Sequence, residues 1–138
     1  MKPDLLAISL PALSVATLLL GSGLAKLIAP NRLQSALQST YRLRRSLARP
    51  IGLAVPVVEV TSSFLVFYEP TRLVGLLLAS SFLLATMLFV SVHWAAGSTG
   101  DCGCWGAVAK SSLSARTILS LTALTVLTIG LTVIYVTS

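Results

Sequence analysis

Charged residues are scarce in this sequence, and acidic residues are the scarcest. Asp and Glu number four among 138 residues, all charged residues make up 10%, and 55% of the chain is hydrophobic. Soluble domains have about 25% charged residues, so the composition excludes an ordinary soluble protein. The net charge is +6, but no nucleic-acid-binding motif accompanies it. In so apolar a chain, Lys and Arg set the topology and contact anionic headgroups, so we expect a lipid bilayer as partner and no nucleic acid.

Cysteine and histidine are also rare. The two cysteines, Cys102 and Cys104, allow one disulfide at most, which excludes a disulfide-stapled scaffold. His93 is the only histidine, so a histidine-based catalytic relay has one candidate and no second member.

Four long apolar runs dominate the rest of the chain. They cover about 5–29, 51–68, 73–95 and 117–136. A helix that crosses a bilayer core needs about 20 residues, and the second run is near the minimum. The alternative for the first run is a signal peptide, which we disfavour because the run is long for the apolar core of one. Short connections favour an antiparallel bundle, so we predict an all-α integral membrane protein with four transmembrane helices in a single domain, 1–138.

The segment 31–49 is amphipathic and joins the first two runs. Its apolar arc holds Leu33, Ala36, Leu37, Thr40, Tyr41, Leu43 and Leu47. A helical period with a basic polar face is typical of a helix lying in the membrane interface. The alternative is a solvated helical linker. We expect the helix to end at Pro50.

The loop 96–115 contains both cysteines, separated by Gly103 alone. A Cys-Gly-Cys ring closes only with a sharp backbone bend, which glycine permits. Small, strained disulfides are labile and prone to exchange, so we interpret Cys102 and Cys104 as a redox-active pair. The N-terminal end of the last span, with Lys110 and Arg116, would favour thiolates.

Two other readings of this loop remain open. The first is a static disulfide, against which a cytoplasmic location would argue. The second is a metal site formed by Cys102, Cys104, His93 and Asp101, although their spacing matches no closed four-ligand pattern.

Glu59 is an acidic residue within the second run, about 12 Å below its start at 1.5 Å per residue. A carboxylate at that depth needs a partner or a proton. Lys26 is the nearest candidate by depth and Arg116 the second. Glu59 is then either a polar anchor for helix packing or a proton carrier, and His93 either an interfacial residue or a ligand.

The basic residues are distributed unequally between the two ends of the predicted bundle. The cysteine side carries seven, namely Arg32, Arg42, Arg44, Arg45, Arg49, Lys110 and Arg116. The side with the termini carries Lys2 and Arg72. The positive-inside rule predicts that the termini lie outside and the Cys-Gly-Cys loop lies in the cytoplasm.

The order of these residues resembles the methylamine-utilisation MauE family, part of the broader DoxX-like group of redox-associated membrane proteins. The resemblance covers essentially the whole chain. It rests on Gly21 and Lys26, Tyr41-Arg42, Pro56-Val57-Val58-Glu59, Asp101-Cys102-Gly103-Cys104-Trp105-Gly106, and Arg116. The most specific part is the Cys-Gly-Cys-aromatic-Gly loop, where Trp105 replaces the usual phenylalanine. The resemblance implies a four-helix membrane bundle linked to thiol redox in partner proteins, often beside a thioredoxin-like protein.

We therefore expect a membrane thiol–disulfide redox protein, in which Cys102 and Cys104 exchange disulfides with a thioredoxin-like or client protein and assist its maturation. The supporting residues are Gly103, Asp101, Trp105, Glu59, Lys26 and Arg116. Two cysteines cannot pass electrons to a second internal pair, so an external acceptor is needed. A quinone would serve, although the sequence has no quinone motif. The competing functions are a non-enzymatic accessory subunit of a larger membrane complex and a small-molecule or metal carrier.

Overall fold

The computed structural model describes residues 3–97, 100 and 115–137. Its elements are α1 (Pro3–Ile28), α2 (Pro30–Ser39), α3 (Arg45–Phe67), the 3-10 turn η1 (Glu69–Thr71), α4 (Arg72–Ala95) and α5 (Ala115–Thr137). In the described part of the chain, four helices are long and apolar enough to cross a membrane. The predicted all-α fold, with four candidate spans and a short helix between the first two, is confirmed, and the chain is an integral membrane protein.

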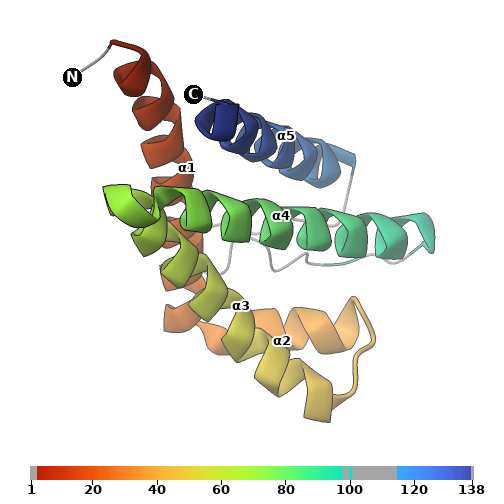
Figure 1. The fold of residues 1–138 in the computed structure, drawn as a ribbon. Helices are drawn as coiled ribbons and strands as arrows, with labels where there is room; N and C mark the ends of the chain where they lie inside the picture. The colour runs from red at the N-terminus through yellow and green to blue at the C-terminus, as the bar shows by residue number, and fades with distance from the viewer. Residues whose placement is uncertain (1–2, 98–99, 101–114, 138) are drawn as a thin grey trace.

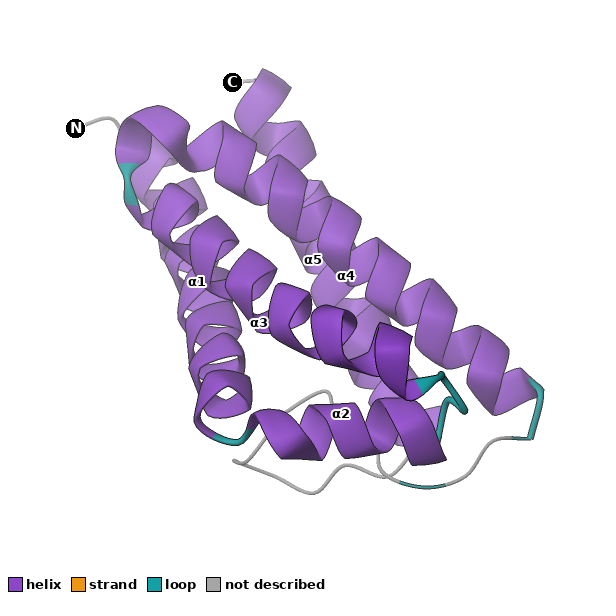
Figure 2. Cartoon of the chain, turned by 90° about the horizontal axis from the view of Figure 1, so that it is seen from below, coloured by secondary structure: helices purple, strands orange, loops and turns teal. Residues whose placement is uncertain are grey.

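The four long helices pack against one another in the order α1, α3, α4, α5. α1 lies along α3, α3 along α4, and α4 along α5, while α5 also touches α1 (Figure 1). α2 packs on α3 and lies across one end of the bundle, and both chain termini are at the other end (Figure 2). This arrangement places α2 beside the end of α1 and the beginning of α3, on the same side of the molecule as the end of α4.

Three groups of buried apolar side chains fill the bundle. The group beside α2 contains Leu33, Leu37, Tyr41, Ala48, Val90 and Leu121. The other two contain Val15, Leu19, Ala79, Leu83 and Leu131, and Ala12, Ala16, Val66 and Leu76. The apolar arc of α2 therefore packs against the bundle, which explains why its hydrophobic period is so regular.

The structure corrects the predicted boundaries of the amphipathic segment. α2 ends at Ser39, and Arg42 adopts a left-handed conformation with φ 53°. The Leu43 N–H donates to the Leu37 carbonyl at 2.9 Å, a wider turn than the bonds between residues four apart inside the helix. Leu43 also packs against the same apolar group as Leu37. This local motif stops the helix, although the apolar period continues past it.

The end expected at Pro50 is also corrected, because α3 begins at Arg45 and runs through Pro50 and Pro56. A proline in a helix removes one N–H donor and crowds the preceding turn. Packing holds the first turns of α3 in spite of this, since Ala48 is fully buried and a Cβ on Gly52 would lie 2.7 Å from Gln34 of α2. Packing of α3 against α2 therefore keeps the helix intact at Pro50, where the sequence alone predicts a helix end.

Candidate functional site: a buried ion pair beside two cavities

The site begins with a close crossing of α1 and α3 at Gly23. A Cβ added to Gly23 would lie 2.8 Å from Val60 Cγ2 and 3.1 Å from Glu59 Cβ. Contacts this short leave no room for a larger residue, so glycine lets the two backbones approach. Gly23 lies one helical turn before Lys26, and the crossing therefore brings Lys26 to the level of Glu59.

Lys26 and Glu59 form a buried ion pair. The Nζ of Lys26 lies 2.6 Å from Oε1 of Glu59, and the two side chains are 4% and 5% exposed. The predicted pairing of these residues is confirmed. Among the described residues, Oε2 of Glu59 is a buried side-chain atom without a hydrogen-bond partner.

Lys26 and Glu59 are two charged side chains buried inside a bundle of apolar helices. Removing a charge from water costs several kcal/mol, and a close partner offsets that cost only when the remaining polar atoms are also satisfied. The pair is neutral as a whole, but the bare Oε2 leaves one strong acceptor position. Lys26 uses one of its three ammonium donors on Glu59, so the site offers both an acceptor and further donors.

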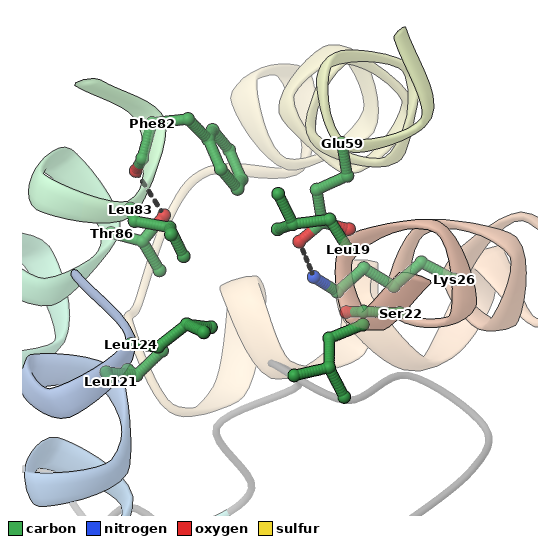
Figure 3. Close-up of a pocket in the computed structure, with 10 residues that line it drawn as sticks. Leu19, Ser22, Lys26, Glu59, Phe82, Leu83, Thr86, Leu121 and Leu124 are labelled. Carbon is green, nitrogen blue, oxygen red and sulfur yellow. Dashed lines mark hydrogen bonds and ion pairs between the residues drawn. The ribbon is translucent and has the colours of Figure 1, made fainter. Parts of the chain in front are cut away.

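Lys26 lines two cavities, and Glu59 lines the smaller of them. The smaller has a volume of about 30 Å³, and Lys26 and Glu59 line it together with Ser22, Phe82 and Thr86 (Figure 3). Such a volume holds one water or one ligand oxygen. In Figure 3 the carboxylate and the ammonium face each other across the α1–α3 contact, and residues of α4 and α5 close the opposite wall.

The larger cavity has a volume of about 350 Å³ and lies between the end of α1, α2, α3 and α4. Most of its wall is apolar. It is lined by Lys26, Leu33, Leu37, Tyr41, Leu43, Ile51, Val55, Phe82, Ala85, Thr86, Phe89 and Val90. Lys26, Phe82 and Thr86 line both cavities, so the two share a wall at the ion pair.

An aromatic cluster lies where α2 meets the end of α4. The rings of Tyr41 and Phe89 are 4.8 Å apart, and His93 lies 4.4 Å from Phe89 and 5.0 Å from Tyr41, as centroid distances. Such spacings are favourable for aromatic pairs. His93 Nδ1 is 2.8 Å from the Phe89 carbonyl oxygen, and the half-buried imidazole is held within its own helix.

Gly100 is placed against the end of α2. Its φ is +129°, a conformation that side chains rarely adopt, and a Cβ there would lie 2.8 Å from Thr40 Oγ1. Thr40 is buried and directly precedes Tyr41. The chain that follows α4 therefore returns to the aromatic cluster at this point.

Comparison with known protein families bears on this arrangement. The family model described as methylamine utilisation protein MauE matches residues 4–136. The chain belongs to the MauE family. Comparison with curated proteins found no match, and comparison with solved structures found none either. The resemblance inferred from the residues is thus confirmed over nearly the whole MauE-family chain.

The predicted site residues of this MauE-family protein fall into two groups. Lys26 and Glu59 meet, and His93 joins the aromatic cluster near Gly100. Arg116 is exposed, and Lys26 is the residue that pairs with Glu59, so the second candidate, Arg116, is not its partner. Cys102, Cys104, Gly103, Asp101 and Trp105 lie outside the described residues.

The metal hypothesis is not tested by the structure. Residues 3–97, 100 and 115–137 contain no group of three His, Cys, Asp or Glu side chains that could hold a metal ion. The ligands proposed from the sequence were His93 with Asp101, Cys102 and Cys104, and the last three are not among the described residues.

Sequence reasoning missed several residues of the site. Gly21 carries part of the family resemblance, but a Cβ at Gly21 meets nothing within 4 Å. The close crossing occurs at Gly23 instead. Phe82 and Thr86, which line both cavities, carried no signal either, because phenylalanine and threonine are ordinary in an apolar helix.

Proposed function

We propose that this MauE-family membrane protein exchanges disulfides with a thioredoxin-like or client protein through Cys102 and Cys104. The observation that carries the proposal is the Cys-Gly-Cys sequence in a family named for methylamine utilisation. Two cysteines one residue apart are rare by chance, and a strained disulfide between them would exchange readily. The exchange would assist maturation of the partner protein.

The chemistry balances with these two cysteines alone. A thiolate of the pair attacks a disulfide of the partner, which forms a mixed disulfide and releases one partner thiolate. The second cysteine then attacks the mixed disulfide, which frees the partner as a dithiol and leaves a Cys102–Cys104 disulfide. The reverse sequence oxidises a partner dithiol. Either direction moves two electrons and two protons, so each turnover needs an external donor or acceptor.

Described residues on both sides of the cysteines support this proposal. Cys102 follows Gly100 by two residues in the sequence. Gly100 in turn packs on Thr40, next to the aromatic cluster. Arg116 is exposed in the first turn of α5. Cationic side chains and helix N-termini favour the thiolate, which is the reactive form.

Trapping of the mixed disulfide tests the proposal. A Cys104→Ser variant keeps Cys102 as its single thiol, and Cys102→Ser keeps Cys104. We expect one of the two to accumulate a covalent adduct with a thioredoxin-like or client protein, identified by mass spectrometry and released by reductant. The matched control is the double variant, which should give no adduct.

The competing functions predict different results. An accessory subunit of a larger membrane complex would copurify with its partners and support their maturation equally well with both cysteines replaced by serine. A metal carrier would bring bound metal that blocks alkylation of the thiols. Either result, or the absence of adducts from both single variants, would exclude disulfide exchange.

A further inference from the structure

The larger cavity and the ion pair together have the properties of a ligand site. The cavity measures about 350 Å³, within the range of small-molecule sites, whereas an apolar cavity of ~150 Å³ is enough for benzene. Ala85 and Phe89 on its wall are exposed, so the cavity is open along α4. Leu88 and Val92 next to this opening are exposed apolar residues of a membrane span, so a ligand would enter from the lipid.

The polar atoms of the ion pair define the head group that a ligand would need. Lys26 lines the cavity, and its ammonium has donors beyond the one used on Glu59. It therefore suits a ligand oxygen that accepts a hydrogen bond. Oε2 of Glu59 is buried and lacks a partner among the described residues, so it suits a hydroxyl that donates. The small cavity, which Glu59 and Lys26 both line, has room for one oxygen.

The neutral charge of the ion pair favours ligands with an uncharged head group over charged ones. Lys26 and Glu59 already neutralise each other, so a fatty-acid carboxylate or a phosphate would introduce an uncompensated buried charge, which is costly. A neutral head group avoids that cost. The walls also present the rings of Tyr41, Phe82 and Phe89, which favour a flat, aromatic-like partner.

We propose that this cavity binds the ring of a membrane quinone, with one ring oxygen at Lys26 and Glu59. The quinone carbonyl accepts a hydrogen bond from Lys26 Nζ, and the hydroxyl of the reduced quinol donates to Glu59 Oε2, directly or through one water in the small cavity. A head group that switches between acceptor and donor matches the two unlike atoms of the ion pair. The apolar tail leaves along α4 into the lipid.

The inference deepens the proposed function by naming the external acceptor, and in that respect it rests on it. Oxidation of the Cys102–Cys104 dithiol to a disulfide releases two electrons and two protons, and reduction of a quinone to a quinol consumes both. The proposed binding uses Lys26, Glu59 and the walls of the two cavities, and neither cysteine takes part in it. It is therefore measured in a Cys102→Ser, Cys104→Ser background, where it succeeds or fails independently of disulfide exchange.

The test uses the full chain in lipid nanodiscs with a photoreactive azidoquinone, and cross-linked peptides are mapped by mass spectrometry. We expect labelling on α2 or on α4 near Ala85. Decylubiquinone should compete at a concentration at least tenfold lower than decylbenzene, which has the same tail and no ring oxygens. Equal competition by the two compounds would show that the cavity takes any apolar chain and would overturn the proposal.

Two variants localise the binding. Ala85→Phe fills the cavity and should reduce labelling at least tenfold, whereas Ala123→Phe makes the same change at an exposed position of α5 outside both cavities and should leave labelling unchanged. Unchanged labelling in Ala85→Phe overturns the proposal. If Ala85→Phe fails to fold, Val55→Phe fills the cavity from α3 and is judged by the same criterion.

A third variant tests the head-group contact. Replacing both members of the ion pair, Lys26→Met with Glu59→Met, removes the donor and the acceptor together and leaves no unpaired charge. The concentration of decylbenzene needed for competition, divided by that of decylubiquinone, should then fall from at least ten to about one. A ratio that stays at ten or more shows that the ion pair does not hold the ring oxygen, and the proposed geometry fails.

Discussion

Lys26 and Glu59 meet inside the membrane-spanning bundle, with Nζ 2.6 Å from Oε1 and both side chains almost fully buried. The contact joins α1 to α3 through one hydrogen-bonded charge pair. Each buried charge would be costly alone, and its partner offsets that cost. The unpartnered Oε2 makes the relationship asymmetric: the carboxylate has acceptor capacity that Lys26 does not use.

Single replacements of the pair should have unequal effects. Lys26→Met leaves an uncompensated carboxylate and should lower the free energy of unfolding by ~3–5 kcal/mol, the usual cost of breaking one side of a buried pair. Glu59→Gln removes the negative charge but keeps a polar group of similar shape, so we expect a smaller loss. Unfolding in mixed micelles measures both.

The double replacement Lys26→Met, Glu59→Met completes a mutant cycle and serves as its control. It should be more stable than Lys26→Met alone, because no charge remains unpaired. Small and additive effects would contradict a direct interaction of the two residues.

Gly23 should be intolerant of a side chain, and Gly21 should not be. Gly23→Val places new atoms against Val60 and the Pro56 carbonyl oxygen, which lies 3.2 Å from the position of the added Cβ, so we expect a loss of ~1–3 kcal/mol. Gly21→Val is the matched control, since nothing lies within 4 Å of its Cβ. Equal stability of the two variants would mean that α1 and α3 do not cross closely at Gly23.

Replacing Arg42 with glycine should stabilise the protein. Its φ of 53° costs free energy for any residue with a Cβ, so Arg42→Gly should raise stability by ~0.5–1 kcal/mol. Arg44→Gly removes the same charge from a residue with φ −63° and should bring no gain. Thermal unfolding of the two proteins in one detergent compares them directly, and a gain in neither would argue against the left-handed end of α2.

Gly100 should matter for disulfide exchange because of its contact with Thr40. Gly100→Ala combines an unfavourable φ with a clash against Thr40 Oγ1, whereas Gly97→Ala has an unfavourable φ of +83° and nothing within 4 Å. If the contact with Thr40 positions the cysteines, the rate at which the thiols react with an alkylating reagent should change more in Gly100→Ala than in Gly97→Ala. Identical changes would assign the effect to backbone strain alone.

The orientation in the membrane is predicted from charge. Seven Lys and Arg residues lie at the cysteine end and two at the end with the termini, so the positive-inside rule places the termini outside. A periplasm-active reporter fused to the C-terminus should be active, and the same reporter inserted in the 96–115 loop should be inactive. The opposite pair of results would reverse the proposed orientation.

The sequence by itself determined the number of spans, the amphipathic character of α2 and the depth at which Glu59 needs a partner. Run length, hydrophobic period and the cost of a charge in lipid are properties of the chain and its solvent, so no knowledge of packing is needed to apply them. Depth also identified Lys26 in place of Arg116, because a pair must lie at one level of the bilayer.

Only the tertiary structure decided which small residue makes the helix crossing, where α2 stops and what surrounds the ion pair. Gly21 and Gly23 are both glycines of α1 and differ only in the face of the helix on which they lie. Which face meets α3 depends on the orientation of α1 about its own axis. The run through Pro50 depends on contacts of α3 with α2. The two cavities arise where residues from several helices fail to fill space together, and no local pattern encodes such a mismatch.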